Sequence, residues 1–331
     1  MEVFTNIYFN DKFSDLQRSS VTIGNFDGCH LGHQNLIKTA IEFSRSSDTP
    51  LRPLAITFAP TAEQYFNQQP TRHNLFSPNQ KTQALSELGL DTLIYEAFDE
   101  KFSHVTHQEF LDKLLINKLD TKALAIGYDF KFGYHRLGDF KFLLESCKHK
   151  DIQLRQLDPV MLGDEIISSS KIRSYLLDGE IDLANKMLGR PYMILGTVEK
   201  GDQLGRTMNF PTANLNKLDQ LVPGHGVYCG WTYIENDADD NQSILKIPKD
   251  IYPTIMNIGI RPTVNNNQQL TRCEAHILDE DFGGSLYGKK LRVYFHSRIR
   301  SEEKFPDIAT LKNAIAKDIN VARKRLNIKS L

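Results

Sequence analysis

Residues 24–33 read GNFDGCHLGH and lie between a β-branched run, Ser20–Gly24, and a segment whose apolar residues recur at helical spacing from Gly32. A strand that passes through a glycine-rich turn into a helix predicts one βαβ unit of a parallel sheet. The start of such a helix offers unpaired backbone amides at the positive end of the helix dipole, which suits a phosphate. His30 and His33 are three residues apart, so both imidazoles can project from the first turn and donate hydrogen bonds to that phosphate. Either histidine alone would more simply be a surface residue, but the complete string favours a phosphate site.

The rest of the N-terminal half repeats the alternation of strand and helix. Four further apolar runs have the composition of strands: Leu54–Phe58, Asp91–Tyr95, Ala123–Gly127 and Ile152–Leu157. Between them, Thr106–Glu109 forms a capping box that predicts the start of a helix. The pattern predicts an α/β domain with a Rossmann-like parallel sheet, whose ligands bind outside the carboxyl ends of the strands.

The second half has a different pattern, in which short strand-like runs are separated by Gly, Pro and Asn. These runs are MILGTV, GVYCGWTYI, IYPTIMNIG, CEAHILD and LRVYFH. They predict a small antiparallel β-barrel. A final helix is predicted from apolar residues that share one face: Leu311, Ile315, Ile319, Ala322 and Leu326. The basic cluster at 323–325 is interpreted as a solvated helix end. Gly189 and Pro191 interrupt a helix, so we predict two domains, 1–188 and 189–331.

Composition limits the class of protein. The chain has 331 residues, enough for about two domains, and a net charge of -1. A charge so close to zero argues against binding to nucleic acid or to a membrane surface. The sequence has no apolar run long enough for a membrane span, and its first residues do not resemble a secretory signal. The four cysteines are scattered without a C-x-x-C pair, which argues against a zinc site and favours free thiols in the cytoplasm. We therefore expect a two-domain intracellular enzyme.

Three segments of the first half resemble known nucleotide-transfer motifs. The GNFDGCHLGH string resembles the HxGH motif of the nucleotidyltransferase superfamily, whose members transfer a nucleotidyl group by in-line attack on an α-phosphate. Ile167–Arg173, ISSSKIR, resembles the ISST-x-IR segment that contacts ATP phosphates in that superfamily. Gly127–Gly133, GYDFKFG, is similar to a stretch of bacterial FMN adenylyltransferases and places Asp129 at the end of a strand, where we expect it to contact the flavin. Phe132 in this stretch is expected in the core. The resemblance implies catalytic roles for His30 and His33, and ATP contacts for Gly24, Asn25, Phe26, Asp27, Gly28, Gly32, Ser169, Ser170 and Arg173.

The second half carries a possible metal and phosphate site of its own in Gly205–Asn214, GRTMNFPTAN. The Thr212 hydroxyl and the Asn214 amide are hard oxygen ligands that suit Mg²⁺, with ATP phosphates completing the shell. Alone, P-T-A-N would simply be a turn entering a strand, but the longer string resembles the flavokinase motif. That resemblance implies ATP contacts for Gly205, Arg206 and Thr207.

Further flavokinase motifs follow in the same order. They include NIGIRPT from Asn257 and CEAHILD, whose Glu274 matches the family's catalytic base. The resemblance implies that Glu274 removes the proton from the ribityl 5′-hydroxyl of riboflavin, a reaction for which a nearby carboxylate is suited. It also implies flavin contacts for Asn257, Arg261 and Arg300.

Taken together, the chain resembles the bacterial bifunctional riboflavin kinase/FMN adenylyltransferases from about residue 20 to the final helix. The resemblance implies that the barrel converts riboflavin to FMN with Mg-ATP. It implies that the α/β domain then converts FMN to FAD with a second ATP and releases pyrophosphate. The expected partners are riboflavin, FMN and ATP, with Mg²⁺ as cofactor and without nucleic acid, membrane or an obligate protein partner.

One departure keeps alternatives open. Phe58–Ala62 reads FAPTA, where family members often have F-[ED]-P-H-P, so a riboflavin kinase whose N-terminal half adenylylates poorly is an alternative. A flavin-sensing or RNA-binding regulator is a second alternative, but it predicts loss of Glu274, Thr212 or the histidine pair. The HIGH motif of class I aminoacyl-tRNA synthetases also resembles HxGH, although that interpretation leaves the barrel unexplained.

Overall fold

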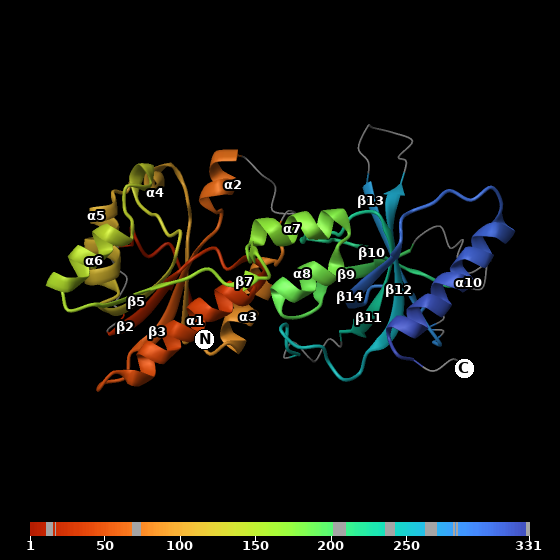
Figure 1. Ribbon diagram of the computed structural model, residues 1–331, viewed down its shortest axis with the longest axis horizontal. Coiled ribbons are helices and arrows are strands. Elements are labelled where there is room, and N and C mark those ends of the chain that lie inside the picture. Colours follow the sequence, from red (N-terminus) through yellow and green to blue (C-terminus); the bar gives the residue numbers. More distant parts are fainter. Residues whose placement is uncertain are drawn as a thin grey trace. The chain divides into compact units, whose positions relative to one another are not determined.

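The computed structural model describes residues 1–10, 16, 18–67, 74–200, 210–235, 242–261, 270–280, 282 and 284–328. Contacts divide the chain into two compact units (Figure 1). The first comprises Met1–Thr71 and Pro78–Ile167, and the second comprises Arg72–Ser77 and Ser168–Leu331. Each unit has a separate sheet and is described by itself.

The first unit is built on a six-stranded parallel sheet in the order β1-β4-β3-β2-β5-β6. Its strands are β1 (Glu2–Thr5), β2 (Ser19–Ile23), β3 (Arg52–Phe58), β4 (Thr92–Glu96), β5 (Thr121–Gly127) and β6 (Gln153–Leu157). The order confirms the predicted parallel α/β fold. Strand β1, at one edge of the sheet, was not predicted because four mostly exposed residues carry little hydrophobic pattern.

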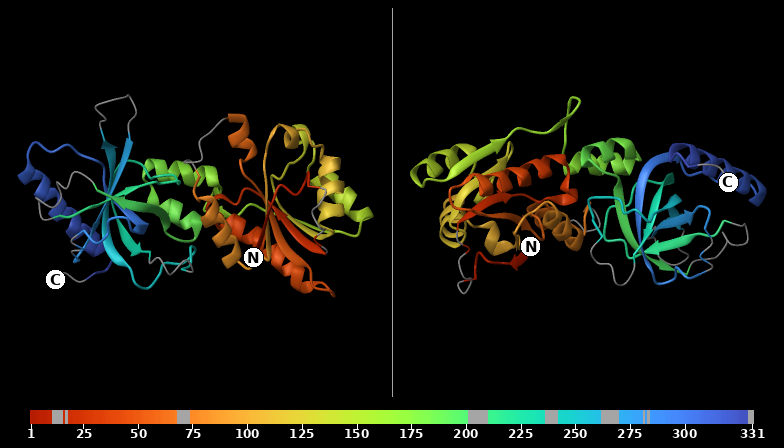
Figure 2. Two further views of the ribbon diagram at one scale, coloured as in Figure 1. Left: turned by 180° about the vertical axis from the view of Figure 1, so that it is seen from behind. Right: turned by 90° about the horizontal axis from the view of Figure 1, so that it is seen from below.

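Helices cover both faces of this sheet (Figures 1 and 2). The helices of this unit are α1 (Leu31–Ser46), α2 (Ala62–Asn67), α3 (Pro78–Glu87), α4 (Glu100–Ser103), α5 (His107–Glu109), the π-helical stretch η3 (Phe110–Lys118) and α6 (Phe140–His149). A short hairpin, β7 (Met161–Leu162) and β8 (Glu165–Ile166), follows β6. Along β5, Leu124 and Ile126 join the large apolar cluster with residues of η3, whereas Ala123 and Ala125 pack with Phe43 of α1. The predicted capping box is present, because Thr106 and Glu109 each accept a hydrogen bond from the other's backbone amide.

Glu96 is a buried carboxylate at the carboxyl end of β4, with 2% of its surface exposed. Its Oε1 atom accepts hydrogen bonds from the backbone amides of Ile7 and Tyr8 at 2.8 and 3.0 Å. Burial raises the pKa of Glu96 to about 7, although the two amides and the Lys118 ammonium act in the opposite direction. The folded first unit therefore binds this proton more tightly than the unfolded chain does.

We expect Glu96→Gln to be more stable than wild type at pH 8, because the amide keeps an oxygen for Ile7 and Tyr8 and removes the buried charge. The raised pKa means that the carboxylate destabilises the folded state above pH 7, by on the order of 3 kcal/mol. The gain should shrink as the pH falls below 7 and vanish below the ordinary value of 4.5, where wild type becomes protonated in both states. Thermal unfolding of both proteins at pH 5.5 and pH 8 measures this difference. A variant that is less stable than wild type at pH 8 would contradict it.

The second unit is a closed barrel with the strand order β10-β13-β12-β11-β14-β9, and every neighbouring pair is antiparallel. Its strands are β9 (Tyr192–Glu199), β10 (Ala213–Asn216), β11 (Gly226–Ile234), β12 (Tyr252–Arg261), β13 (Leu270–Ile277) and β14 (Lys290–Arg300). The helices of this unit are α7 (Ser169–Asp178), α8 (Ile181–Leu188) and α10 (Ile308–Arg325). The barrel and the final helix confirm the prediction for the second half.

Helix α10 packs on the barrel through Ala322 and the residue that follows the helix, Leu326, as its apolar pattern predicted. The interpretation of residues 323–325 as a solvated helix end fits Lys324 and Arg325, which are exposed, but not Arg323, whose side chain is 13% exposed. Arg323 pairs with Asp279, and Arg325 donates hydrogen bonds to the Ser297 hydroxyl and to a backbone carbonyl of β14. These contacts attach the last turn of the helix to β14 and to the residues after β13.

Helix α8 belongs with the barrel by its contacts. It buries Ile181, Ala184, Met187 and Leu188. Its Asn185 side chain donates to the Phe295 carbonyl at 2.9 Å and accepts from the Tyr192 amide at 2.7 Å. By its contacts, the second unit therefore starts at Ser168, which is earlier in the chain than the predicted boundary at 188/189. The boundary at 188/189 stays a prediction about which residues fold independently.

We expect a fragment of residues 168–331 to convert riboflavin to FMN, and a fragment of residues 189–331 to melt at a lower temperature. The shorter fragment lacks α7 and α8, and burying each large apolar side chain of these helices contributes about 1.5 to 3 kcal/mol. Both fragments omit residues 74–77, so they form a matched pair. Circular dichroism melting and FMN production measure the two properties. A folded longer fragment without kinase activity would contradict the assignment of that activity to the barrel.

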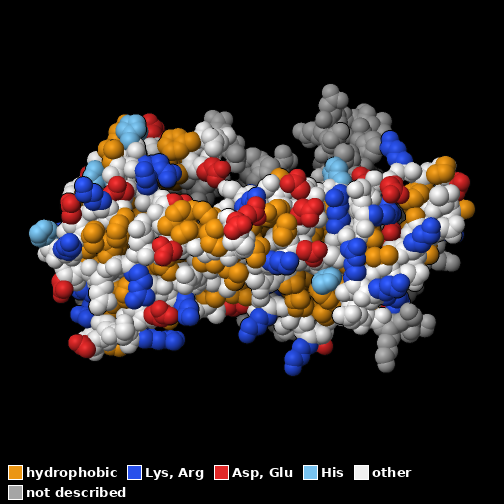
Figure 3. Space-filling model, viewed as in Figure 1, with side chains coloured by type: hydrophobic (Ala, Val, Ile, Leu, Met, Phe, Trp, Pro, Cys, Tyr) orange, Lys and Arg blue, Asp and Glu red, His pale blue; other side chains and the backbone are white. Residues whose placement is uncertain are grey.

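No described helix is long and apolar enough to cross a membrane. On the face of the molecule in Figure 3, basic and acidic side chains are interspersed.

Candidate active sites

The first candidate site is the turn between β2 and α1. It contains a short 3-10 segment, η1 (Asp27–Cys29), and three of its residues have positive φ: Phe26 at 47°, Gly28 at 70° and Cys29 at 45°. The turn is held to β3 because the Thr57 hydroxyl donates to the Asn25 carbonyl at 3.2 Å. The departure at 58–62 runs from the last residue of β3 to the first residue of α2.

His30 is the N-cap of α1, and its Nδ1 atom accepts a hydrogen bond from the backbone amide of His33 at 3.3 Å. Because Nδ1 accepts, a neutral His30 carries its proton on Nε2. The two imidazole rings are stacked, with centroids 3.6 Å apart and an angle of 18° between the rings. The structure thus brings together the two predicted histidines and orients the first of them as an Nε2 donor.

Two glycines of the motif make room for rings. A Cβ atom at Gly32 would lie 3.1 and 3.2 Å from Cε1 and Nδ1 of His30, and one at Gly24 would lie 3.3 Å from the Phe26 ring. Phe26 is itself fully buried, and its ring meets His33 edge to face at 5.4 Å. The Phe26 side chain therefore packs beneath the histidine pair, so ATP could contact this residue through its backbone alone.

Asp129 lies two residues after Gly127, the last residue of β5, and is exposed, as predicted for a residue at the carboxyl edge of the sheet. Phe130 and Phe132 come after it and stack on one another at 5.4 Å. Phe132 is 8% exposed and belongs to the main apolar cluster, which confirms its expected place in the core.

Ser169 and Ser170 are the first two residues of α7, and Arg173 lies one turn further on. The capping residue of this helix is Ser168, whose hydroxyl accepts from the Lys171 amide at 3.2 Å. Helix capping was the simpler role considered for Ser169 and Ser170, but in the structure Ser168 fills that role.

The second candidate site lies on the outer face of the barrel, where β10, β13 and β12 meet. The strand register places Glu274 opposite Asn214 on one side and opposite Asn257 on the other, so the three polar side chains form one row. Their neighbours Ala213, Ala275 and Met256 are buried in the barrel, because side chains alternate along each strand. The structure thus brings together the predicted base Glu274, the predicted metal ligand Asn214 and the predicted flavin contact Asn257.

The Glu274 carboxylate is 12% exposed and has two polar neighbours. Thr212, just before β10, has its hydroxyl 3.5 Å from Oε1 of Glu274. Arg272 donates from Nη2 to the same oxygen at 2.5 Å. Arg272 was not predicted, although its position two residues before Glu274 on a strand places it on the same face.

The remaining predicted residues of this half differ in their surroundings. Arg300 is paired with Asp318, a buried residue of α10: its Nε atom lies 3.1 Å from both carboxylate oxygens, and its Nη2 atom lies 2.9 Å from Oδ2. This contact attaches α10 to β14 and gives Arg300 a structural role. Arg261 ends β12, and its side chain lies outside the described residues, as do Gly205, Arg206 and Thr207.

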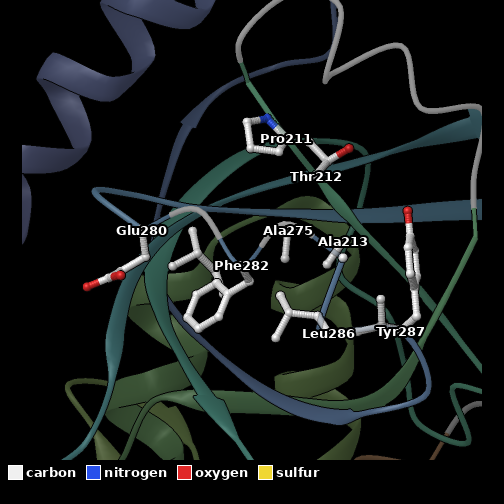
Figure 4. A pocket seen from close by; sticks show the side chains of 11 residues that line it. Pro211, Thr212, Ala213, Ala275, Glu280, Phe282, Leu286 and Tyr287 are labelled. Atoms are coloured by element: carbon white, nitrogen blue, oxygen red, sulfur yellow. The ribbon is translucent and has the colours of Figure 1, made fainter.

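An apolar pocket opens beside Thr212. Its lining includes the inward-facing Ala213 and Ala275 together with Phe282, Leu286 and Tyr287, and Figure 4 shows these side chains around the hollow with Pro211 and Thr212 at its rim. Because Thr212 lines the pocket and also approaches Glu274, the pocket and the carboxylate are adjacent.

A metal site made of protein ligands alone is not found in the part of the chain that the structure describes, where no group of three or more His, Cys, Asp or Glu side chains could hold an ion. A cation at Thr212 and Asn214 would therefore need further oxygen ligands from a bound molecule.

Comparison with known proteins finds a separate family model for each half of the chain. A family model described as FAD synthetase matches residues 12–171, and one described as riboflavin kinase matches residues 188–326. The chain is 34% identical over 302 residues to a bifunctional riboflavin kinase/FMN adenylyltransferase of Pseudomonas fluorescens, which covers 91% of each protein. It is 35% identical over 303 residues to the protein of the same name from Escherichia coli K12, covering 92% of this chain and 91% of that protein. A solved structure titled as a macrolide-efflux protein from Streptococcus pneumoniae matches with a TM-score of 0.83 and 27% identity, covering 98% of this chain and 99% of that one.

Proposed function

The chain belongs to the family of bifunctional riboflavin kinases/FMN adenylyltransferases, and from that membership we propose which of its residues carry out each reaction. It is a bifunctional transferase. One activity phosphorylates riboflavin with ATP to give FMN and ADP, and the other transfers AMP from a second ATP to FMN, which gives FAD and pyrophosphate.

Glu274 is the proposed base of the kinase reaction. Thr212 and Arg272 both contact Oε1 of Glu274, so Oε2 is the oxygen that we propose takes the proton of the ribityl 5′-hydroxyl. The hydroxyl oxygen then forms a bond to the γ-phosphorus of ATP as the bond to the leaving ADP breaks. The neighbouring Asn257, in register with Glu274, is placed to hydrogen-bond the flavin, and Arg261 and Arg300 are proposed as further flavin contacts.

Thr212 and Asn214 are the proposed ligands of Mg²⁺. They fit because each supplies a neutral hard oxygen beside a carboxylate, and because Mg²⁺ commonly binds through few protein ligands together with substrate phosphates. When bound, the ion neutralises charge on the ATP phosphates. The apolar pocket beside Thr212 is the proposed site for the adenine ring, with Gly205, Arg206 and Thr207 as phosphate contacts.

His30 and His33 are the proposed catalytic residues of adenylylation. An FMN phosphate oxygen attacks the α-phosphorus of ATP, and pyrophosphate leaves. The Nε2–H group of His30 is placed to donate to the α-phosphate, whose charge grows in the transition state. Further ATP contacts are proposed for residues 24–28, Gly32, Ser169, Ser170 and Arg173, and a flavin contact is proposed for Asp129.

A cytoplasmic location is proposed from the cysteines, since all four are free and buried.

The observation that carries this assignment is the row of Asn214, Glu274 and Asn257 across three strands, with the Thr212 hydroxyl beside the carboxylate. The test is to incubate the purified protein with riboflavin, ATP and Mg²⁺ and to separate FMN from FAD by chromatography. Both products are expected. FMN that accumulates without FAD would support the alternative of a kinase alone, and the absence of both would contradict the proposal.

A further inference from the structure

His276 is a polar residue of β13 that the assignment above leaves without a role. It lies two residues after Glu274, on the same face of the strand. Its Nδ1 atom is 2.8 Å from the carbonyl oxygen of Pro211, the residue immediately before Thr212. A backbone carbonyl can only accept, so Nδ1 carries the proton and donates it to this contact.

This hydrogen bond lies where the backbone hydrogen bonds between β10 and β13 end. The pairing of the two strands ends at Ala213 opposite Ala275, and the same register continued would place Thr212 opposite His276. Pro211 has no N–H group, so it cannot donate to a neighbouring strand. Its carbonyl still needs a donor, and the His276 imidazole supplies one.

The same imidazole also contacts the residue before Pro211. The Phe210 ring meets the His276 ring edge to face, with centroids 5.8 Å apart and an angle of 87° between the rings. One side chain on β13 therefore holds both residues that lead into Thr212, one by a hydrogen bond and the other by packing.

We propose that His276 is a positioning residue of the kinase site, which holds the backbone at residues 210–212 so that the Thr212 hydroxyl stays beside Glu274 and the nucleotide. This inference rests on the proposed role of Thr212 and Asn214 in binding Mg-ATP. His276 acts through Thr212 and does not touch the substrate.

The surroundings of His276 support a neutral donor. Burial lowers the pKa of the imidazole below its ordinary value of 6.5, against the opposing effects of the Pro211 carbonyl and the Asp279 carboxylate. The Nδ1–H donor is thus available without a positive charge near the site where a cation is proposed.

The size of the effect follows from geometry. The Thr212 hydroxyl is 3.5 Å from Oε1 of Glu274, so a small shift of residues 210–212 changes its distance from that group and from the pocket. A neutral hydrogen bond contributes about 1 kcal/mol, and a misplacement of about 1 Å in an active site can reduce the rate by up to about 10²-fold. We expect a reduction of about tenfold in kcat/KM for Mg-ATP when the donor is removed.

Two substitutions in the full chain separate hydrogen bonding from packing. His276→Phe keeps a ring against Phe210 but removes the donor, and His276→Asn keeps an N–H donor near the place of Nδ1. The matched control is His296→Phe, at another half-buried barrel histidine, whose ring meets Trp231 edge to face at 5.2 Å. FMN formation, KM for Mg-ATP and amide hydrogen exchange over residues 210–216 are measured for each variant. Conversion of supplied FMN to FAD checks that the first unit is intact, and circular dichroism melting checks the fold of the barrel.

The expected result is a loss of about tenfold in kcat/KM for Mg-ATP with His276→Phe, recovery to within about threefold of wild type with His276→Asn, and wild-type behaviour of His296→Phe. Amide exchange at residues 213–216 should be faster in His276→Phe than in the other proteins. Wild-type activity and exchange in His276→Phe would overturn the proposal. Equal loss in the Phe and Asn variants would also overturn it, because the donor would then not matter.

Thr212→Ala distinguishes this inference from the proposed function on which it rests. If Thr212→Ala leaves FMN formation unchanged, the role proposed for Thr212 is wrong. If Thr212→Ala lowers FMN formation and His276→Phe reduces it further in that background by the full tenfold, His276 does not act through Thr212. We expect little further loss in the double variant.

Discussion

FMN formation by the Glu274→Gln variant is expected to fall by about 10²- to 10⁴-fold, the usual range for loss of a general base. The substitution keeps the size of the side chain and one oxygen for Thr212 and Arg272, but it removes the basic oxygen that would take the 5′-hydroxyl proton. Phosphoryl transfer can proceed through a loose transition state that needs little help from a base, so the lower end of the range is expected.

The test is to measure three properties on one preparation of the Glu274→Gln variant: riboflavin affinity, FMN formation and conversion of supplied FMN to FAD. Riboflavin affinity should change little, because the lost interaction belongs to the transition state. Adenylylation should survive, since it is assigned to residues of the other half. Unchanged FMN formation would remove Glu274 from the mechanism, and loss of all three properties would indicate a misfolded variant.

The reverse pattern is expected when the histidine pair is changed. His30→Ala and His33→Ala should each lower FAD formation from FMN by about 10²-fold or more, the usual effect of removing one donor to a developing phosphate charge. His30→Ala also removes the N-cap of α1, which adds a loss of stability of about 1 kcal/mol. FMN formation from riboflavin should stay near wild type in both variants.

His149→Ala, at the exposed end of α6, is the matched control for a lost histidine in the same unit. Melting temperatures separate the capping effect of His30 from its effect on catalysis, because His33 is not a cap. Wild-type rates of FAD formation in both His30→Ala and His33→Ala would show that the HxGH assignment is wrong.

Much of the fold could be predicted from the sequence because the elements follow strong patterns. Strands β2, β3, β4 and β5 are apolar runs, and the five longer barrel strands lie between turn residues. In the site, the motif order pointed to Glu274, and the strand register places Asn214 and Asn257 on either side of it. That arrangement follows from pairing between strands that are distant in sequence, which the spacing of residues along the chain does not show.

The contacts that the sequence did not predict are mostly polar ones made over long distances. No sequence pattern marked Asp318, yet it is 6% exposed and pairs with Arg300. Phe26 looked like part of a nucleotide loop, but its positive φ turns the ring into the core beneath His33. In the segment ISSSKIR, the first serine, Ser168, caps helix α7, whereas Ser169 and Ser170 are the first residues of the helix. In the first case the partner lies on another element, in the second the ring's place depends on the backbone angle at one residue, and in the third the cap depends on where the helix begins.

Strand β13 gives the kinase half a particular sensitivity to insertions and deletions. Glu274 faces outward toward the proposed flavin site, while the next residue, Ala275, faces the apolar pocket. Insertion of one amino acid between Cys273 and Glu274 would exchange the two faces of the strand. The Glu274 carboxylate would then point into the barrel, and the Ala275 methyl group would point outward. Point substitutions can tune the base or the pocket separately, but a change in the length of this strand disrupts both at once.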